Sequence, residues 1–191
     1  SALFYKIYGH GAFQVNLGTV FFSFLLLPVV YAWARDAGGK LAGLIALILC
    51  LIGPGGFFHY NVSPRGGYAV TLLAITSILW LAGRIACSER LGKRPANTRY
   101  LLLGLIAGLG FWTNLLVVPA ILTSAVILAF ILRLKVFSSR LNYAAGGFLT
   151  GSLPFWAWNA LNGWQSLGMG ASFTLSQSLF KGEFASVWSQ R

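Results

Sequence analysis

One long apolar run limits what this chain can fold into. Residues 101–132, LLLGLIAGLGFWTNLLVVPAILTSAVILAFIL, contain no charged side chain over 32 positions. About 20 helical residues cross the hydrocarbon core of a bilayer, so this run is too long for one upright crossing and short for two. We therefore expect a membrane protein in which the run forms either two short helices or one strongly tilted helix.

Basic residues on both sides of the run favour two helices. Short loops rich in Lys and Arg stay on the cytoplasmic side of a membrane, and such residues both precede and follow the run: Arg90, Lys93, Arg94, Arg99, Arg133, Lys135 and Arg140. Both ends should then lie on one side, and the run should cross and return as a short re-entering hairpin. We expect its turn at residues 111–114, Phe-Trp-Thr-Asn, because aromatic and polar side chains suit the far interface.

The composition agrees with a membrane location. The chain is 57% hydrophobic and only 9% charged, whereas soluble domains carry about 25% charged residues. A net charge of +11 would also suit a nucleic-acid-binding protein. However, ten of the 14 Lys and Arg residues fall within residues 35–40, 84–99 and 133–140, a grouping typical of membrane orientation. We expect no nucleic-acid partner, and a multi-pass protein of the plasma (inner) membrane with these three segments on the cytoplasmic side.

The remaining apolar segments predict an all-α transmembrane bundle. With the hairpin they give about six membrane helices, and the further spans are expected at residues 12–34, 41–52, 69–86 and 141–158. Residues 35–40 should form a tight turn and residues 87–100 the longest basic loop. The second span should stop early at Gly53-Pro54-Gly55-Gly56, because Pro removes a backbone donor and Gly loosens the helix.

Two further expectations concern the ends of the chain. Residues 164–191 are too polar to span, and their aromatic residues recur at helical spacing, which predicts an amphipathic helix on the outer interface; a solvent-exposed loop is the alternative. The expected domains are thus a transmembrane segment, residues 1–163, and an interfacial region, residues 164–191. Because the chain starts at Ser1 without a methionine, we expect an internal piece of a longer protein.

The candidate binding residues lie on the predicted outer side. They are Arg65, His59, Tyr60, Asn114 and Asn159. A guanidinium offers several donors in a fixed fork suited to phosphate, so Arg65 is the main candidate for binding a lipid-linked phosphate. The alternatives are ordinary ones: headgroup contact for Arg65, an interfacial position for His59, and helix capping for Asn114 and Asn159.

Other kinds of chemistry have little support in the sequence. No charged residue falls near the middle of a predicted span, although ion-coupled transporters usually need ionisable groups at that depth. Cys50 and Cys87 have no metal-ligand company and should not form a disulfide. We expect neither a metal nor a cofactor. The repeats Gly104-x-x-x-Gly108 and Gly147-x-x-x-Gly151 should allow helices to approach closely, and nothing more is inferred from them.

Several segments resemble one family of membrane enzymes. Residues 103–114, LGLIAGLGFWTN, are similar to part of the GT-C glycosyltransferases, among them the family-39-like enzymes akin to protein O-mannosyltransferases and the lipid A aminoarabinose transferase. The same holds for residues 22–54, 62–73 and 146–163. The resemblance covers most of the chain, in the family's order, through patterns of Gly, Pro and aromatic residues.

The resemblance implies transfer of a sugar from a polyprenyl-phosphate carrier to an acceptor, which could be a lipid, a glycan or a protein, outside the cytoplasm. It places the catalytic acid in a loop upstream of Ser1, so no catalytic residue is assigned within this chain. Many relatives have a basic residue where this chain has Asn114, so the resemblance gives that position no role toward the phosphate. The alternatives are a segment of a transporter or flippase, with the break at residues 53–56 as a discontinuous helix, and a non-catalytic membrane subunit.

Overall fold

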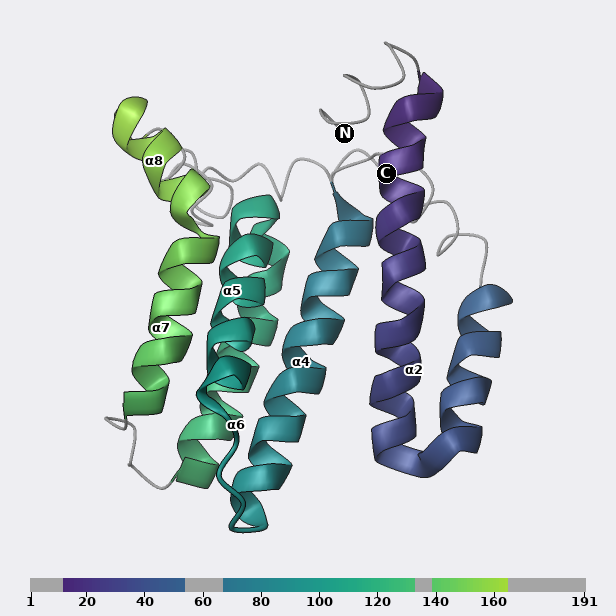
Figure 1. Cartoon of the computed structure of the whole chain (residues 1–191). Coiled ribbons are helices and arrows are strands. Elements are labelled where there is room, and N and C mark those ends of the chain that lie inside the picture. The colour runs from purple at the N-terminus through teal and green to yellow at the C-terminus, as the bar shows by residue number, and fades with distance from the viewer. Residues whose placement is uncertain (1–11, 54–66, 133–138, 165–191) are drawn as a thin grey trace, which may run out of the picture. The chain divides into compact units, whose positions relative to one another are not determined.

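The computed structural model describes residues 12–53, 67–132 and 139–164 (Figure 1). Within these ranges the chain forms helices and no strand, which confirms the all-α prediction for the described part. The chain divides into two compact units, residues 1–152 and 153–191. His59, Tyr60, Arg65, the break at residues 54–56 and the predicted amphipathic helix after Trp164 lie outside the described residues.

The first helix in the described part of unit 1, α2 (Ala12–Leu51), is a pair of arms joined by a sharp bend. Gly39 has φ 83° inside an otherwise helical stretch, a conformation that only glycine adopts without strain. The arms pack closely, because a Cβ on Gly43 would lie 2.8 Å from the ring of Tyr31. The turn predicted at residues 35–40 is therefore confirmed, although the bend is confined to Gly39, and the second arm ends at Leu51 as expected.

The next two helices are joined by a shorter loop than the sequence predicts. Helix α4 (Tyr68–Arg90) runs four residues past the expected end of the span, and α5 (Asn97–Thr113) starts four residues before residue 101. The basic loop expected at residues 87–100 is thus wrong in extent, and only residues 91–96 connect the helices. Basic side chains mark the edge of a membrane, but they do not end a helix, since Lys and Arg are good helix formers.

The long apolar run folds as a hairpin. Helix α5 ends at Thr113, the 3₁₀ turn η1 (Leu115–Val117) follows, and α6 (Val118–Leu132) returns. Asn114 adopts an extended conformation (φ −163°, ψ 130°) between the two helical parts. The prediction of two helices with a turn next to residues 111–114 is therefore confirmed, and the tilted single helix is wrong.

The single span predicted for residues 141–158 is wrong, because two helices occupy it. Helix α7 (Ser139–Gly151) belongs to the first unit and α8 (Leu153–Leu161) to the second. Pro154 falls in the first turn of α8, where its missing N–H leaves no hydrogen bond unmade. Pro154 thus starts a helix instead of lying within one.

The helices of the first unit pack around a small-residue core. Helix α5 lies against α7, and α4 lies against α2, α5 and α6. The buried side chains of this core include Ile78, Ile85, Tyr100 and Val117. Glycines let α5 and α7 meet backbone to backbone: a Cβ on Gly104 would lie 2.8 Å from the Phe148 nitrogen. The close approach predicted from the two Gly-x-x-x-Gly repeats is confirmed.

Much of the apolar surface faces outward. In the most apolar stretch of α2 only 11% of the residues are buried, and Phe24 and Leu49 are each 66% exposed. Two helices, within Asn16–Leu51 and Tyr68–Arg90, are long and apolar enough to cross a membrane, and Leu115–Ile131 is a shorter apolar helix. Exposed apolar area on this scale is a liability in water and is typical of contact with lipid.

Candidate functional site

Charged side chains of unit 1 meet where several helix ends come together. Asp36, at the bend of α2, contacts Trp80 and Arg84 near the end of α4. Glu89, one turn further along α4, contacts the start of α5 through Tyr100 and the start of α7 through Arg140. Residues from each of the three basic segments, among those that the structure describes, therefore lie at one end of the unit, as the sequence predicts. Which side of the membrane this end faces stays a prediction.

Asp36 accepts hydrogen bonds from Trp80 and Arg35 and forms an ion pair with Arg84. The indole Nε1 of Trp80 donates to Oδ2 at 2.9 Å, Arg84 Nε lies 3.4 Å from the same oxygen, and Arg35 Nη2 lies 3.2 Å from Oδ1. The Trp80 hydrogen bond, followed by the two arginines, holds the pKa of Asp36 below its ordinary value. The carboxylate thus stays charged, and it joins the bend of α2 to α4.

Glu89 is the centre of a second, more buried cluster. Its Oε1 lies 2.6 Å from Arg140 Nη1, and the Tyr100 hydroxyl donates to the same oxygen at 2.9 Å. Tyr100 is fully buried. Burial, and then the hydrogen bond to Glu89, raises the pKa of Tyr100 to about 12. The tyrosine therefore remains a neutral donor at any physiological pH, and one carboxylate ties α4 to α5 and α7.

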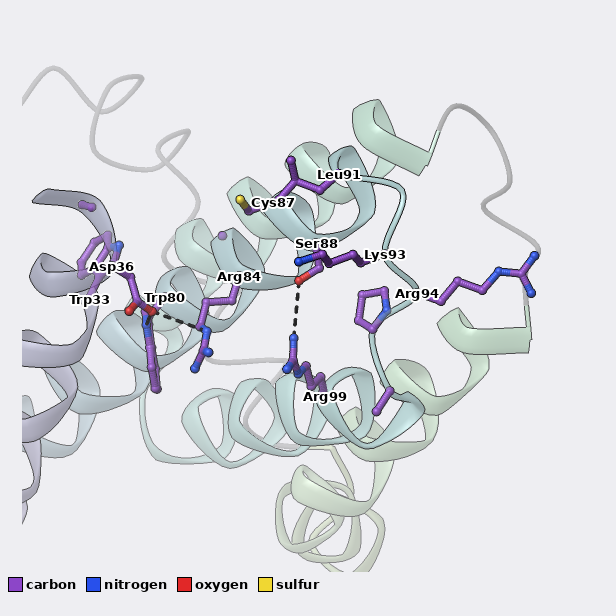
Figure 2. Close-up of a pocket in the computed structure, with 14 residues that line it drawn as sticks. Trp33, Asp36, Trp80, Arg84, Cys87, Ser88, Leu91, Lys93, Arg94 and Arg99 are labelled. Carbon is purple, nitrogen blue, oxygen red and sulfur yellow. Dashed lines mark hydrogen bonds and ion pairs between the residues drawn. The ribbon is translucent and has the colours of Figure 1, made fainter. Parts of the chain in front are cut away.

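A cavity of about 660 Å³ opens beside these clusters (Figure 2). It lies between the bend of α2, the last turns of α4, the loop of residues 91–96 and the start of α5. Cationic side chains dominate its lining, which includes Arg84, Lys93, Arg94 and Arg99, with Asp36 as its single acid. The described residues contain no group of three or more His, Cys, Asp or Glu that could hold a metal ion. The arrangement suits an anion, and we call it the basic-end cavity.

Of the predicted binding residues, the two that the structure describes, Asn114 and Asn159, do not line this cavity. Arg65, His59 and Tyr60 lie outside the described residues. Asn159, in the second unit, is buried; its Nδ2 donates to the Phe155 carbonyl at 3.0 Å, while its Oδ1 has no hydrogen-bond partner among the described residues. Asn114 caps the turn of the hairpin, because its Oδ1 accepts a hydrogen bond from the Leu116 backbone nitrogen at 3.0 Å. This contact is the helix-capping role that was the alternative for Asn114.

Replacing Asn114 by alanine should destabilise the hairpin turn by about 1 kcal/mol, the typical effect of losing a capping side chain. Asn114→Asp keeps the acceptor and should lie within a few tenths of a kcal/mol of the unmodified protein, by the same ranking of capping residues. Equilibrium unfolding in mixed detergent and denaturing detergent measures both. Equal losses for alanine and aspartate would show that the capping hydrogen bond does not contribute.

The basic-end cavity was not predicted from the sequence. The pattern identified its cations only as markers of membrane orientation. The sequence contained one indication of it: Asp36 and Glu89 each lie within a predominantly basic segment. An acidic residue in such a segment suggests an ion pair with a basic side chain. Neither partner could be named, because Trp80 and Arg140 lie 44 and 51 residues away in the chain.

Comparison of the chain with family models, with curated proteins and with solved structures finds no match.

Proposed function

We propose that the chain is the membrane-embedded part of a glycosyltransferase that transfers a sugar from a polyprenyl-phosphate carrier to an acceptor outside the cytoplasm. In this proposal about six helices, with the hairpin among them, cross or enter the plasma membrane. Two apolar helices of spanning length support the membrane location. The bend at Gly39 and the turn at Asn114 fall within or at the end of the segments that resemble the GT-C enzymes.

One observation carries the proposal: the hairpin turn between α5 and α6 packs against the first half of α4. A Cβ on Gly110, at the end of α5, would lie 3.0 Å from both Ala74 Cβ on α4 and Val117 Cγ1 in η1. The turn at Asn114 therefore packs against the first half of α4, which begins at Tyr68, three residues after Arg65. This supports a site at the end of the unit opposite the basic-end cavity, the end at which α4 begins.

The proposed reaction is an inverting displacement at the sugar's anomeric carbon. An acceptor hydroxyl attacks that carbon and gives its proton to a carboxylate, which the family resemblance places in a loop before Ser1. The bond between the anomeric carbon and the phosphate oxygen breaks with its electron pair, so polyprenyl phosphate leaves as an anion. Arg65 would stabilise the charge that develops on this phosphate.

In the intact protein that contains this chain, Arg65→Ala should lower sugar transfer by about a hundredfold, the usual effect of removing one donor to a developing anion. Release of polyprenyl phosphate from a panel of polyprenyl-phosphate-linked sugars, the class of donor that the resemblance implies, measures it. The matched control is Arg90→Ala, an arginine at the other end of α4, which should retain full activity.

Two outcomes would contradict the proposal. Unchanged turnover in Arg65→Ala protein with normal folded yield would remove Arg65 from the site. Movement of the carrier lipid across proteoliposome membranes without sugar transfer would favour the flippase alternative.

A further inference from the structure

We propose that the basic-end cavity binds the phosphate of an anionic phospholipid headgroup. This proposal does not depend on the one for sugar transfer, because it uses only residues near the bend of α2, the end of α4 and the start of α5. Four cationic side chains against one carboxylate leave a surplus of three positive charges on its lining. The carboxylate, Asp36, already accepts hydrogen bonds from Arg35 and Trp80 and is paired with Arg84, so an incoming anion would meet the remaining cations.

Lys93 and Arg99 are the cations best placed to bind an anion. Arg99 Nη1 lies 3.5 Å from the Ser88 hydroxyl oxygen, and Figure 2 shows the Lys93 side chain running toward the same serine. Arg94 extends away from this group in the same view. Ser88, Lys93 and Arg99 together present a hydroxyl, an ammonium and a guanidinium, which are the donor types that bind phosphate.

The loop that carries Lys93 is fixed to the end of α4. The backbone nitrogens of Leu91, Gly92 and Lys93 donate to the carbonyls of Cys87, Glu89 and Ser88, at 3.1, 3.0 and 3.0 Å. Gly92 has φ 71°, the left-handed conformation with which helices commonly end. The backbone that carries Lys93 is therefore held in place by hydrogen bonds to the end of α4. Because this backbone is already ordered, little of its conformational entropy would be lost when a ligand binds.

The surroundings of the cavity favour a lipid over free phosphate. At about 660 Å³ the cavity is far larger than a phosphate ion, so the rest of a headgroup would fit. Indole rings of Trp33 and Trp80 form part of its wall, with Trp33 40% exposed, and tryptophan is enriched where membrane meets water. The first arm of α2, on which Trp33 lies, also carries the exposed side chains of Phe24 and Leu25, which would accommodate acyl chains.

Native mass spectrometry of the detergent-purified chain tests the site, with dioleoylphosphatidylglycerol and dioleoylphosphatidylcholine as probes. We expect retention of phosphatidylglycerol, and a tenfold or greater loss of its affinity in the Lys93→Gln/Arg99→Gln variant, because each cation at a membrane surface contributes about 1 kcal/mol. Arg90→Gln, which removes a charge from α4 without lining the cavity, should change affinity less than twofold. Should the double variant fail to fold, Lys93→Gln alone removes only an exposed loop cation and should weaken binding about fivefold.

Each remaining result would overturn the proposal. Equal retention of phosphatidylcholine would show that the cavity does not select lipids by the net charge of the headgroup. An equal loss in Arg90→Gln would show a diffuse attraction instead of a site. Displacement of phosphatidylglycerol by millimolar inorganic phosphate would identify a site for the free anion.

Discussion

Replacing Gly104 by leucine is expected to separate α5 from α7 and to cost about 3 kcal/mol or more of unfolding free energy, above the usual penalty for overpacking. A Cβ on Gly104 would overlap the Ala144 carbonyl and lie 2.8 Å from the Phe148 nitrogen. The same applies from the opposite side, where a Cβ on Gly147 would overlap the Leu101 carbonyl and lie 2.9 Å from the Leu105 nitrogen. These obstacles are backbone atoms, so no side chain can rotate away and the helices themselves must move.

Gly146→Leu is the matched control for this prediction. Gly146 lies on α7 directly beside Gly147, yet a Cβ there would meet nothing within 4 Å. Unfolding of purified protein in mixtures of mild and denaturing detergent, followed by helical circular dichroism, compares the two variants. Equal stability of Gly104→Leu and Gly146→Leu would show that the close approach of α5 and α7 does not hold the unit together.

The parts of the fold that could be predicted from sequence depend on local chemistry. Glycine at a four-residue spacing is enough to predict close helix approach, and the length of an uncharged run limits how often it can cross a membrane. The bend at Gly39 follows similarly from two adjacent glycines in a charged turn. The hairpin turn at Asn114 follows from the change in the apolar run from aliphatic to aromatic and polar residues.

The errors arose where tertiary contacts decide between two locally acceptable conformations. The end of α4 extends past Cys87 because Glu89, in the predicted loop, faces Arg140 and Tyr100 from a helical position. Pro154 is compatible with a kinked helix or with the first turn of a new one, and the sequence does not distinguish them. The basic-end cavity depends on Asp36 meeting Arg84, a contact that charge patterns alone do not specify.

Replacing Glu89 by glutamine is expected to destabilise the first unit by about 2–3 kcal/mol, since it removes the charged partner of a largely buried arginine. The side chains of Arg140 and Glu89 are only 23% and 16% exposed. The variant would leave the guanidinium without its counter-charge and weaken the hydrogen bond from buried Tyr100. Detergent unfolding measures the change.

Asp36→Asn is the control. The side chains of Asp36 and Arg84 are 29% and 44% exposed, and an ion pair at such a surface contributes at most about 1 kcal/mol.

A double-mutant cycle separates the pair itself from the cost of an unpaired charge. If the instability of Glu89→Gln comes from the isolated guanidinium, adding Arg140→Met should restore part of the lost stability, because no buried charge then remains. Additive losses in the double variant would instead mean that the two residues act independently, and that the link between α4 and α7 rests on the glycine contacts of α5. The Tyr100→Phe variant tests the contribution of the tyrosine hydroxyl, the third member of the cluster. It removes only a neutral donor, so we expect the free energy of unfolding to fall by about 1 kcal/mol. Adding Arg140→Met to this variant should not restore that loss.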